Sequence, residues 1–248
     1  MVQPSEAGHR AGMDAMVLAA TVPEAATGVL ADLGAGAGAA GLAAATRLPG
    51  LSVVLVERSA VMAEYARRSL ALDSNAHLAG RARIVEADVS LHGTRRRDAG
   101  LPDCAFDYVI MNPPFNAARD RTTPDQLKAE AHAMQTDDLF ERWLRTAAAI
   151  LKPGGQVSVI ARPQSMRDVL EALGKRFGGV EITPLCPRRG DDAIRILVTA
   201  IKGSRARLRL RDSLVMHEGA GQGVSPRMND LNNGLGCWPR RPENRSSK

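Results

Sequence analysis

Residues 28–38 read Gly-Val-Leu-Ala-Asp-Leu-Gly-Ala-Gly-Ala-Gly, and an alanine-rich stretch follows them. The apolar run at 28–33 predicts a buried strand, the glycines a sharp turn and the alanines a helix. Glycine lets the backbone approach a ligand closely, and the first turn of a helix presents free N–H groups to a carboxylate or phosphate. A flexible alanine–glycine linker is the alternative, but the patterns on both sides favour a strand–turn–helix unit that binds a ligand.

Strand and helix patterns alternate from this unit to about Lys202, which is typical of a parallel sheet covered on both faces. Residues 92–103, with Arg95, Arg96 and Arg97, are expected to form a solvated surface loop. Lys152-Pro153-Gly154-Gly155 is expected to be the turn that stops one helix and starts the fifth strand. The strands are expected at 28–33, 51–57, 82–86, 105–111, 155–161, 179–184 and 193–201, and the helices at 14–21, 38–48, 59–76, 137–151 and 164–176.

Acidic residues lie at the ends of the first three strands. Glu57 ends the second strand, where a carboxylate accepts hydrogen bonds from ribose hydroxyls. Asp88 follows the third strand and is placed to accept from an adenine amine, with a helix N-cap as the alternative. Asp32 precedes the glycines, where it can orient the glycine loop and face a cationic ligand. Because the spacing from Gly36 to Gly41 also fits the dinucleotide fingerprint, a nicotinamide-dependent oxidoreductase stays open as an alternative.

A second motif, Asn112-Pro113-Pro114-Phe115, follows the strand predicted at 106–111. It therefore sits at a carboxyl end, where open α/β sheets place their ligands. Prolines fix their own φ angles and remove two backbone donors, so the segment offers only acceptors beside an aromatic ring. Such a site suits a planar group that carries an –NH2. A proline-rich loop that merely caps a strand is the alternative.

Together these motifs resemble the class I S-adenosylmethionine-dependent methyltransferases, in the branch whose fourth strand ends in Asn-Pro-Pro-Phe/Tyr. The segment Gly8–Ala15 is similar to the leader of the tRNA(valine) adenine N6-methyltransferase family. The resemblance implies an α/β, Rossmann-like, doubly wound sheet of seven strands, mostly parallel with an antiparallel last strand. It implies that the target amine is held by Asn112, Pro113, Pro114 and Phe115, and that S-adenosylmethionine is held by Asp14, Asp32, Leu33, Gly34, Ala35, Gly36, Gly38, Glu57, Asp88 and Asn112.

The resemblance also implies a reaction: transfer of a methyl group to N6 of adenine-37 in valine tRNA. Glutamine methylation in release factors and guanine methylation in ribosomal RNA use the same four-residue motif and remain alternatives. A non-catalytic cofactor-binding module is a third. The guanine enzymes are expected to carry a duplicated second domain, for which 248 residues are too few.

Charge is distributed unevenly along the chain. The net charge is +6, and all of this excess lies in residues 201–248. Arg205, Arg207 and Arg209 alternate with other residues, which predicts a strand with arginines on one face and suits a phosphate backbone. An edge strand protected by charge from aggregation is the alternative. Arg119 and Arg121 lie in the long polar segment 116–136, which is expected to close over RNA as a lid.

Composition and segment boundaries complete the expectations. We expect a leader helix at 1–22, a cofactor-binding methyltransferase domain at 23–203, and a basic strand with a disordered tail at 204–248. No stretch has the length of a membrane span, and the start lacks the layout of a secretion signal. The three scattered cysteines show neither a disulfide framework nor metal spacing, so a cytoplasmic protein without metal is expected.

Overall fold

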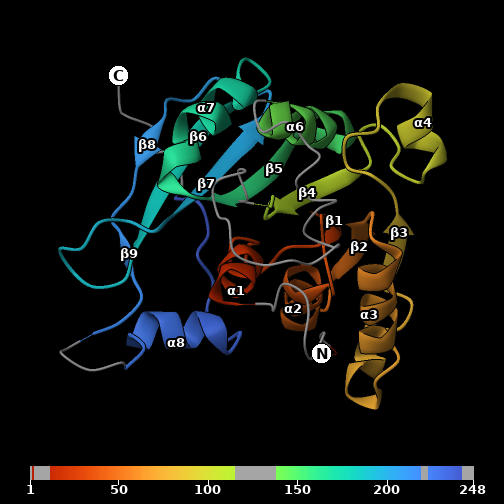
Figure 1. Cartoon of the computed structure of the whole chain (residues 1–248), viewed down its shortest axis with the longest axis horizontal. Coiled ribbons are helices and arrows are strands. Elements are labelled where there is room, and N and C mark those ends of the chain that lie inside the picture. The colour runs from red at the N-terminus through yellow and green to blue at the C-terminus, as the bar shows by residue number, and fades with distance from the viewer. Residues whose placement is uncertain (1, 3–11, 115–137, 219–222, 242–248) are drawn as a thin grey trace, which may run out of the picture.

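The computed structural model describes residues 2, 12–114, 138–218 and 223–241, which form an α/β sandwich around one sheet (Figure 1). Within these residues the sheet has nine strands, in the order β3-β2-β1-β4-β5-β7-β6-β8, with β9 also paired to β6. The strands are β1 (Gly28–Leu33), β2 (Leu51–Glu57), β3 (Ala82–Glu86), β4 (Phe106–Met111), β5 (Leu151–Ala161), β6 (Phe177–Cys186), β7 (Arg195–Lys202), β8 (Arg209–Leu210) and β9 (Leu214–Val215).

The predicted fold class is confirmed in its main features. β7 runs antiparallel to both β5 and β6, and every other pairing is parallel. The number of strands differs from the expected seven, because β8 and β9 add two-residue strands to β6. Of the first seven strands, all but β5 begin and end within two residues of the expected positions, and β5 begins at Leu151 instead of Gly155.

Helices cover both faces of the sheet, as Figure 1 shows, with α6 and α7 on one face and α1, α2, α3 and α8 on the other. Successive strand residues point to opposite faces. In β1, Ala31 and Leu33 belong to the hydrophobic cluster under α6 and α7, whereas Leu30 belongs to the cluster under α1 and α2. The helices are α1 (Met13–Ala20), α2 (Ala39–Arg47), α3 (Ala60–Leu70), α4 (Gly93–Asp98), α6 (Leu139–Ile150), α7 (Met166–Leu173) and α8 (Pro226–Asn232).

Two expectations about helices and the loops between them are wrong. Residues 92–103 contain α4 rather than only a loop, and Arg96 is buried at 3% exposure instead of solvated. Its guanidinium donates to the carbonyl oxygen of Leu101 at 2.6 Å and forms an ion pair with Asp103. The predicted helix at 59–76 ends early as well, because α3 stops at Leu70 and a 3₁₀ helix, Asp73–Leu78, follows.

The turn expected at Lys152–Gly155 is part of β5 in the structure. Phe106 pairs with Leu151 and Tyr108 with Gln156, so the register between β4 and β5 shifts across these residues. Gly154 has a φ of +79°, a conformation that suits glycine. The segment therefore changes the register between two strands instead of connecting a helix to a strand.

The C-terminal segment differs from the expected disordered tail. Residues 223–241 contain α8, and the backbone N–H of Trp238 donates to the carbonyl oxygen of Ala20 in α1 at 2.7 Å. Arg240 donates to the Thr199 hydroxyl of β7 at 3.0 Å. Buried contacts with α1 and with the sheet thus hold this segment, whose glycine- and asparagine-rich composition resembled that of a flexible tail.

The predicted arginine-bearing strand over 205–211 is reduced to β8. Glu181 of β6 is 2% exposed and attracts the guanidiniums of this region. Arg209 donates to its carboxylate at 2.7 Å, and Arg211 lies within 3.5 Å of it. Arg211 also lies over the Trp238 ring, 4.7 Å from its centroid. Arg205 and Arg207 are exposed, so the expected single row of arginines is divided between an exposed pair and an inward pair.

Candidate functional site

The glycine loop after β1 is held against the end of β2. The backbone N–H groups of Gly34 and Ala35 both donate to the carbonyl oxygen of Val56, at 2.8 and 3.0 Å. The N–H of Gly36 donates to Glu57 Oε2 at 2.8 Å. Gly34, Gly36 and Gly38 have φ values of +71°, +56° and +88°. These left-handed conformations explain why glycine occupies alternate positions in the loop.

The three glycines differ in what surrounds them. A Cβ at Gly34 would lie 2.4 Å from Trp143 Cη2, and one at Gly38 would lie 2.8 Å from a methyl group of Leu55. A Cβ at Gly36 would meet only the terminal methyl of Met62, at 3.6 Å. Gly34 and Gly38 are therefore constrained by packing, whereas the backbone of Gly36 is accessible to a ligand.

Asp32 anchors the helix that follows the loop. Its side chain is 3% exposed, and Oδ2 accepts the backbone N–H of Gly41, in the first turn of α2, at 2.8 Å. Burial raises the pKa of Asp32 to about 7, the Gly41 hydrogen bond partly offsets this, and the nearby Glu57 carboxylate raises it further. Asp32 thus contacts the start of the helix that follows the glycine loop.

Gly41 completes the dinucleotide-like spacing for a packing reason. A Cβ there would lie 2.5 Å from a Leu55 methyl and 2.9 Å from a Val53 methyl. The absence of a side chain lets α2 approach β2 closely. The third glycine therefore follows from helix–sheet contact and is no specific sign of a nicotinamide cofactor.

Glu57 and Asp88 lie at the ends of neighbouring strands, as expected. Glu57 Oε1 accepts the backbone N–H of Ser59 at 2.8 Å, in addition to the Gly36 contact. Asp88 Oδ1 accepts the backbone N–H of Ser90 at 2.7 Å and is partly buried. Asp88 does not cap a helix, because α4 has His92 at its N-cap. Both carboxylates stabilise loops at this edge and keep lone pairs for further donors.

Asn112, Pro113 and Pro114 lie beside the glycine loop. Leu33, the last residue of β1, pairs with Met111, the last residue of β4. Gly34 and Asn112, which come directly after them, therefore lie at the ends of neighbouring strands. Asn112 Oδ1 is buried and accepts no hydrogen bond from the described residues. Pro113 is buried and Pro114 is exposed. Phe115, Arg119 and Arg121, three further predicted residues, lie outside the described residues.

The remaining predicted residues lie elsewhere along the sheet. Asp14 of α1 accepts from Arg195 Nε at 3.0 Å, which ties the leader helix to the start of β7. Arg209 binds the buried Glu181, a contact that favours a structural role for its guanidinium. Arg205 and Arg207 are exposed beyond β7. The structure thus brings together the glycine loop, Glu57, Asp88 and the Asn112 segment, and it separates the arginines from them.

Trp143 is a residue that the sequence did not single out. It lies on α6, is 7% exposed and packs against Gly34. Its indole nitrogen is buried and has no hydrogen-bond partner among the described residues. The sequence offered only its position as a clue: Trp143 belongs to the first described helix after the Asn112 motif.

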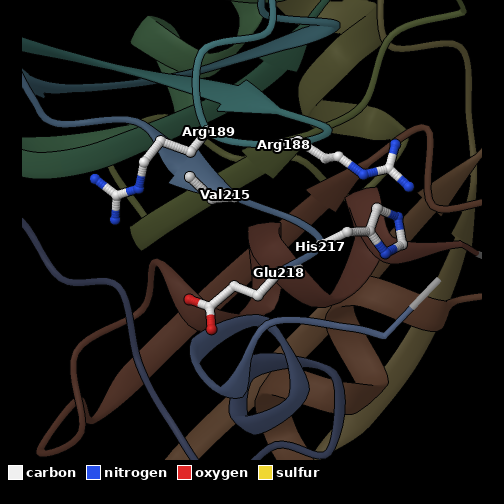
Figure 2. Close-up of a pocket in the computed structure, with 5 residues that line it drawn as sticks. All are labelled: Arg188, Arg189, Val215, His217 and Glu218. Atoms are coloured by element: carbon white, nitrogen blue, oxygen red, sulfur yellow. The ribbon is translucent and has the colours of Figure 1, made fainter. Parts of the chain in front are cut away.

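A cavity of about 500 Å³ lies apart from these residues, between the turn after β6 and the segment after β9. Figure 2 shows Arg188 and His217 extending to one side of it, whereas Arg189 and Glu218 point the other way. Both signs of charge line this cavity, and no predicted site residue does.

Within the described ranges, no helix is both long and apolar enough to cross a membrane. Metal-binding groups of three or more His, Cys, Asp or Glu are likewise absent from the described part of the chain.

Comparison with known proteins gives a consistent family. The model of the family described as methyltransferase small domain matches residues 12–184. A crystal structure of a predicted O-methyltransferase from Agrobacterium tumefaciens is 49% identical, with a TM-score of 0.80, and the match covers 92% of this chain and all of that one.

Curated relatives carry three different acceptors in their names. A tRNA1(Val) (adenine(37)-N6)-methyltransferase of Shewanella sp. is 29% identical over 77% of this chain and 76% of the relative. A release factor glutamine methyltransferase of Bifidobacterium longum is 31% identical over 59% of this chain and 51% of the relative. A ribosomal RNA large subunit methyltransferase G of Shewanella amazonensis is 30% identical, and the match covers 62% of this chain but only 34% of the relative.

Proposed function

Because the chain belongs to the methyltransferase small domain family and is an S-adenosylmethionine-dependent methyltransferase, we propose that it methylates N6 of adenine in tRNA, at position 37 of valine tRNA. The observation that carries the proposal is the buried Asn112 Oδ1. It is an acceptor without a partner among the described residues, beside the glycine loop. An amine hydrogen of the substrate would satisfy it.

The loop and strand ends fit S-adenosylmethionine. The accessible backbone at Gly36 allows close approach of a ligand, and Glu57 is placed to accept from ribose hydroxyls. Asp88, at the end of the next strand, would accept from the adenine amine of the cofactor. The Asp32 carboxyl has a pKa of about 7, and a cationic ligand nearby would favour its charged form. The cofactor supplies an electrophilic methyl group on a sulfonium, which is already an excellent leaving group.

The protein's task at the acceptor is to orient a weak nucleophile. The lone pair of an aromatic amine is delocalised into its ring. Hydrogen bonds from the amine to Asn112 Oδ1 and the Pro113 carbonyl oxygen would favour a pyramidal nitrogen, with the lone pair directed at the methyl group. Holding the two reactants in this geometry supplies most of the rate enhancement, with electrostatic preorganisation adding to it. Phe115 would stack on the base, which must leave its own stack to enter the site.

Two features favour RNA over the other acceptors. Arg205 and Arg207 are exposed cations in a C-terminal region that carries the whole charge excess of the chain. A glutamine side chain does not need such a surface. The chain also matches about three quarters of the tRNA-modifying relative, but about half of the glutamine-modifying relative and a third of the ribosomal one. We therefore place tRNA first, in the cytoplasm where its modification takes place.

The experiment is methyl transfer from labelled S-adenosylmethionine to tRNA, ribosomal RNA and release factor, with the methylated atom identified by mass spectrometry. The proposal expects N6-methyladenosine in tRNA. A methyl group found on a ribose oxygen, on guanine or on glutamine would contradict the proposed acceptor and identify another.

Asn112→Ala is expected to abolish turnover while calorimetry still detects cofactor binding, because the loop and Glu57 remain. The control is Asn233→Ala, which removes the same amide at an exposed position at the end of α8 and should keep wild-type turnover. Activity retained by Asn112→Ala would contradict the assigned role.

A further inference from the structure

Two residues near the ends of β1 and β4 carry buried polar atoms without hydrogen-bond partners among the described residues. One is the acceptor Asn112 Oδ1, and the other is the donor Trp143 Nε1. Neither has a partner in the described part of the chain. The Asn112 acceptor has a role in the proposed function, but the Trp143 donor has none.

Packing brings Trp143 to the reaction corner. The position of its ring is fixed by Gly34, where an added Cβ would lie 2.4 Å from Cη2 and 2.9 Å from Cζ3. Leu33 and Met111, the paired residues that precede Gly34 and Asn112, lie in the same hydrophobic cluster as Trp143. The benzene edge of the indole therefore packs against the end of β1, and β4, which carries the amine-binding motif, is the neighbouring strand.

A buried indole N–H usually has a hydrogen-bond partner, because leaving the donor unpaired forfeits its bond with water. A ligand that enters this corner would provide one. A substrate amine bound at Asn112 Oδ1, with an acceptor atom beside it, would provide a partner for both groups. The N6 amine of adenine has this pattern, since ring nitrogens that accept hydrogen bonds flank it.

We propose that the Trp143 indole N–H donates a hydrogen bond to the ring nitrogen beside the target amine, so that Trp143 and Asn112 read the two adjacent groups together. This inference rests on the proposed amine acceptor and adds a substrate-binding residue to it. A base with a donor beside its amine would set two donors against each other and would bind more weakly.

The two tryptophans of the chain allow a direct test by NMR. Trp238 Nε1 already donates to the Thr183 hydroxyl at 3.2 Å, whereas Trp143 Nε1 has no partner among the described residues. The two indole N–H signals are assigned with Trp143→Phe and Trp238→Phe. The protein is then titrated with S-adenosylhomocysteine, followed by an RNA stem-loop that carries the target adenine or a glutamine-bearing release factor peptide.

The inference expects the Trp143 signal to move downfield when the RNA is added and the Trp238 signal to stay in place. A downfield shift with S-adenosylhomocysteine alone would assign the donor to the cofactor and overturn the inference. No shift with either acceptor would also overturn it. A shift with the peptide and none with the RNA would overturn the inference, because glutamine has no ring nitrogen, and would also reject RNA as the substrate.

Kinetics provide an independent measurement. Trp143→Phe keeps a ring against Gly34 and removes the N–H, so kcat/KM is expected to fall about three- to tenfold, as for one neutral hydrogen bond. The loss should disappear on an RNA whose target adenine has carbon in place of the contacted ring nitrogen. An equal loss on both RNAs would mean a structural role only. Trp238→Phe, the same change at the other tryptophan, should leave kcat/KM near the wild-type value.

Discussion

Single side chains at the β1 and β2 ends have more than one task. Asp32 anchors the start of α2 through Gly41, and its carboxyl, with a pKa of about 7, titrates beside Glu57. Glu57 holds the backbone of Gly36 and of Ser59 while it remains an acceptor for ribose. A residue with two tasks of this kind can show opposite effects on stability and on binding when it is replaced.

The pH dependence of stability tests the charge state of Asp32. Its pKa is about 7 in the folded protein against an ordinary value of 3.8, so the folded state binds more protons than the unfolded state between these values. Stability from protonated Asp32 is therefore fully present below about pH 4 and is lost as the pH rises through 7. Asp32→Asn keeps an acceptor for the Gly41 N–H but has no charge. The free energy of unfolding is measured in urea for both proteins from pH 4 to 8. As the pH rises, the wild-type protein should lose stability relative to Asp32→Asn. A difference between the two that stays constant with pH would contradict the raised pKa.

At the scale of elements, Glu181 in β6 organises the C-terminal segment. Arg209 and Arg211 come from β8 and the residue after it, and Arg240 comes from beyond α8, with its nearest nitrogen 4.0 Å from the carboxylate. The backbone N–H of Arg241 also donates to Glu181, at 3.2 Å. One buried carboxylate thus joins segments that are separated by thirty residues of chain.

Replacing Glu181 is expected to destabilise this part of the protein strongly. Glu181→Ala would leave several largely buried guanidiniums without their counter-ion, a change that costs about 3–5 kcal/mol for a buried pair. The control is Glu171→Ala, which breaks an exposed ion pair with Arg167 on α7 and should change the free energy of unfolding little. Chemical unfolding measures both, and equal effects would mean that Glu181 does not hold the segment.

At the scale of the whole molecule, the balanced charge of residues 1–200 contrasts with the excess in the C-terminal region. Because Glu181 neutralises part of that excess internally, the surface available to a nucleic acid is smaller than the sequence indicates. Arg205 and Arg207 are the two arginines of the predicted row that remain exposed. Counting arginines along the chain therefore overestimates the number available for phosphate contacts.

Replacing both Arg205 and Arg207 by Ala is expected to weaken tRNA binding. The slope of the logarithm of the binding constant against the logarithm of the salt concentration should also become shallower, by roughly one unit for each lost phosphate contact. A matched control removes two exposed arginines from helices, Arg68 on α3 and Arg145 on α6. Binding titrations over a range of salt concentrations compare the two. The same loss in both variants would indicate a general effect of net charge instead of a local contact.

The order of strands and helices, the glycine loop and the Asn112 motif could be predicted from the amino acids alone, because hydrophobic periodicity and the special backbones of glycine and proline are local properties. Family resemblance also predicted an antiparallel strand at the end of a seven-stranded sheet, and the seventh strand, β7, is antiparallel. Tertiary structure decided the rest, because burial and pairing depend on residues far apart in the chain. Only the packed protein shows that Arg96 is buried, that Arg209 and Arg211 turn toward Glu181, and that residues 223–241 bind α1 and the sheet. The contact between Trp143 and Gly34, which lie 109 residues apart, is likewise a product of α6 folding over the end of β1.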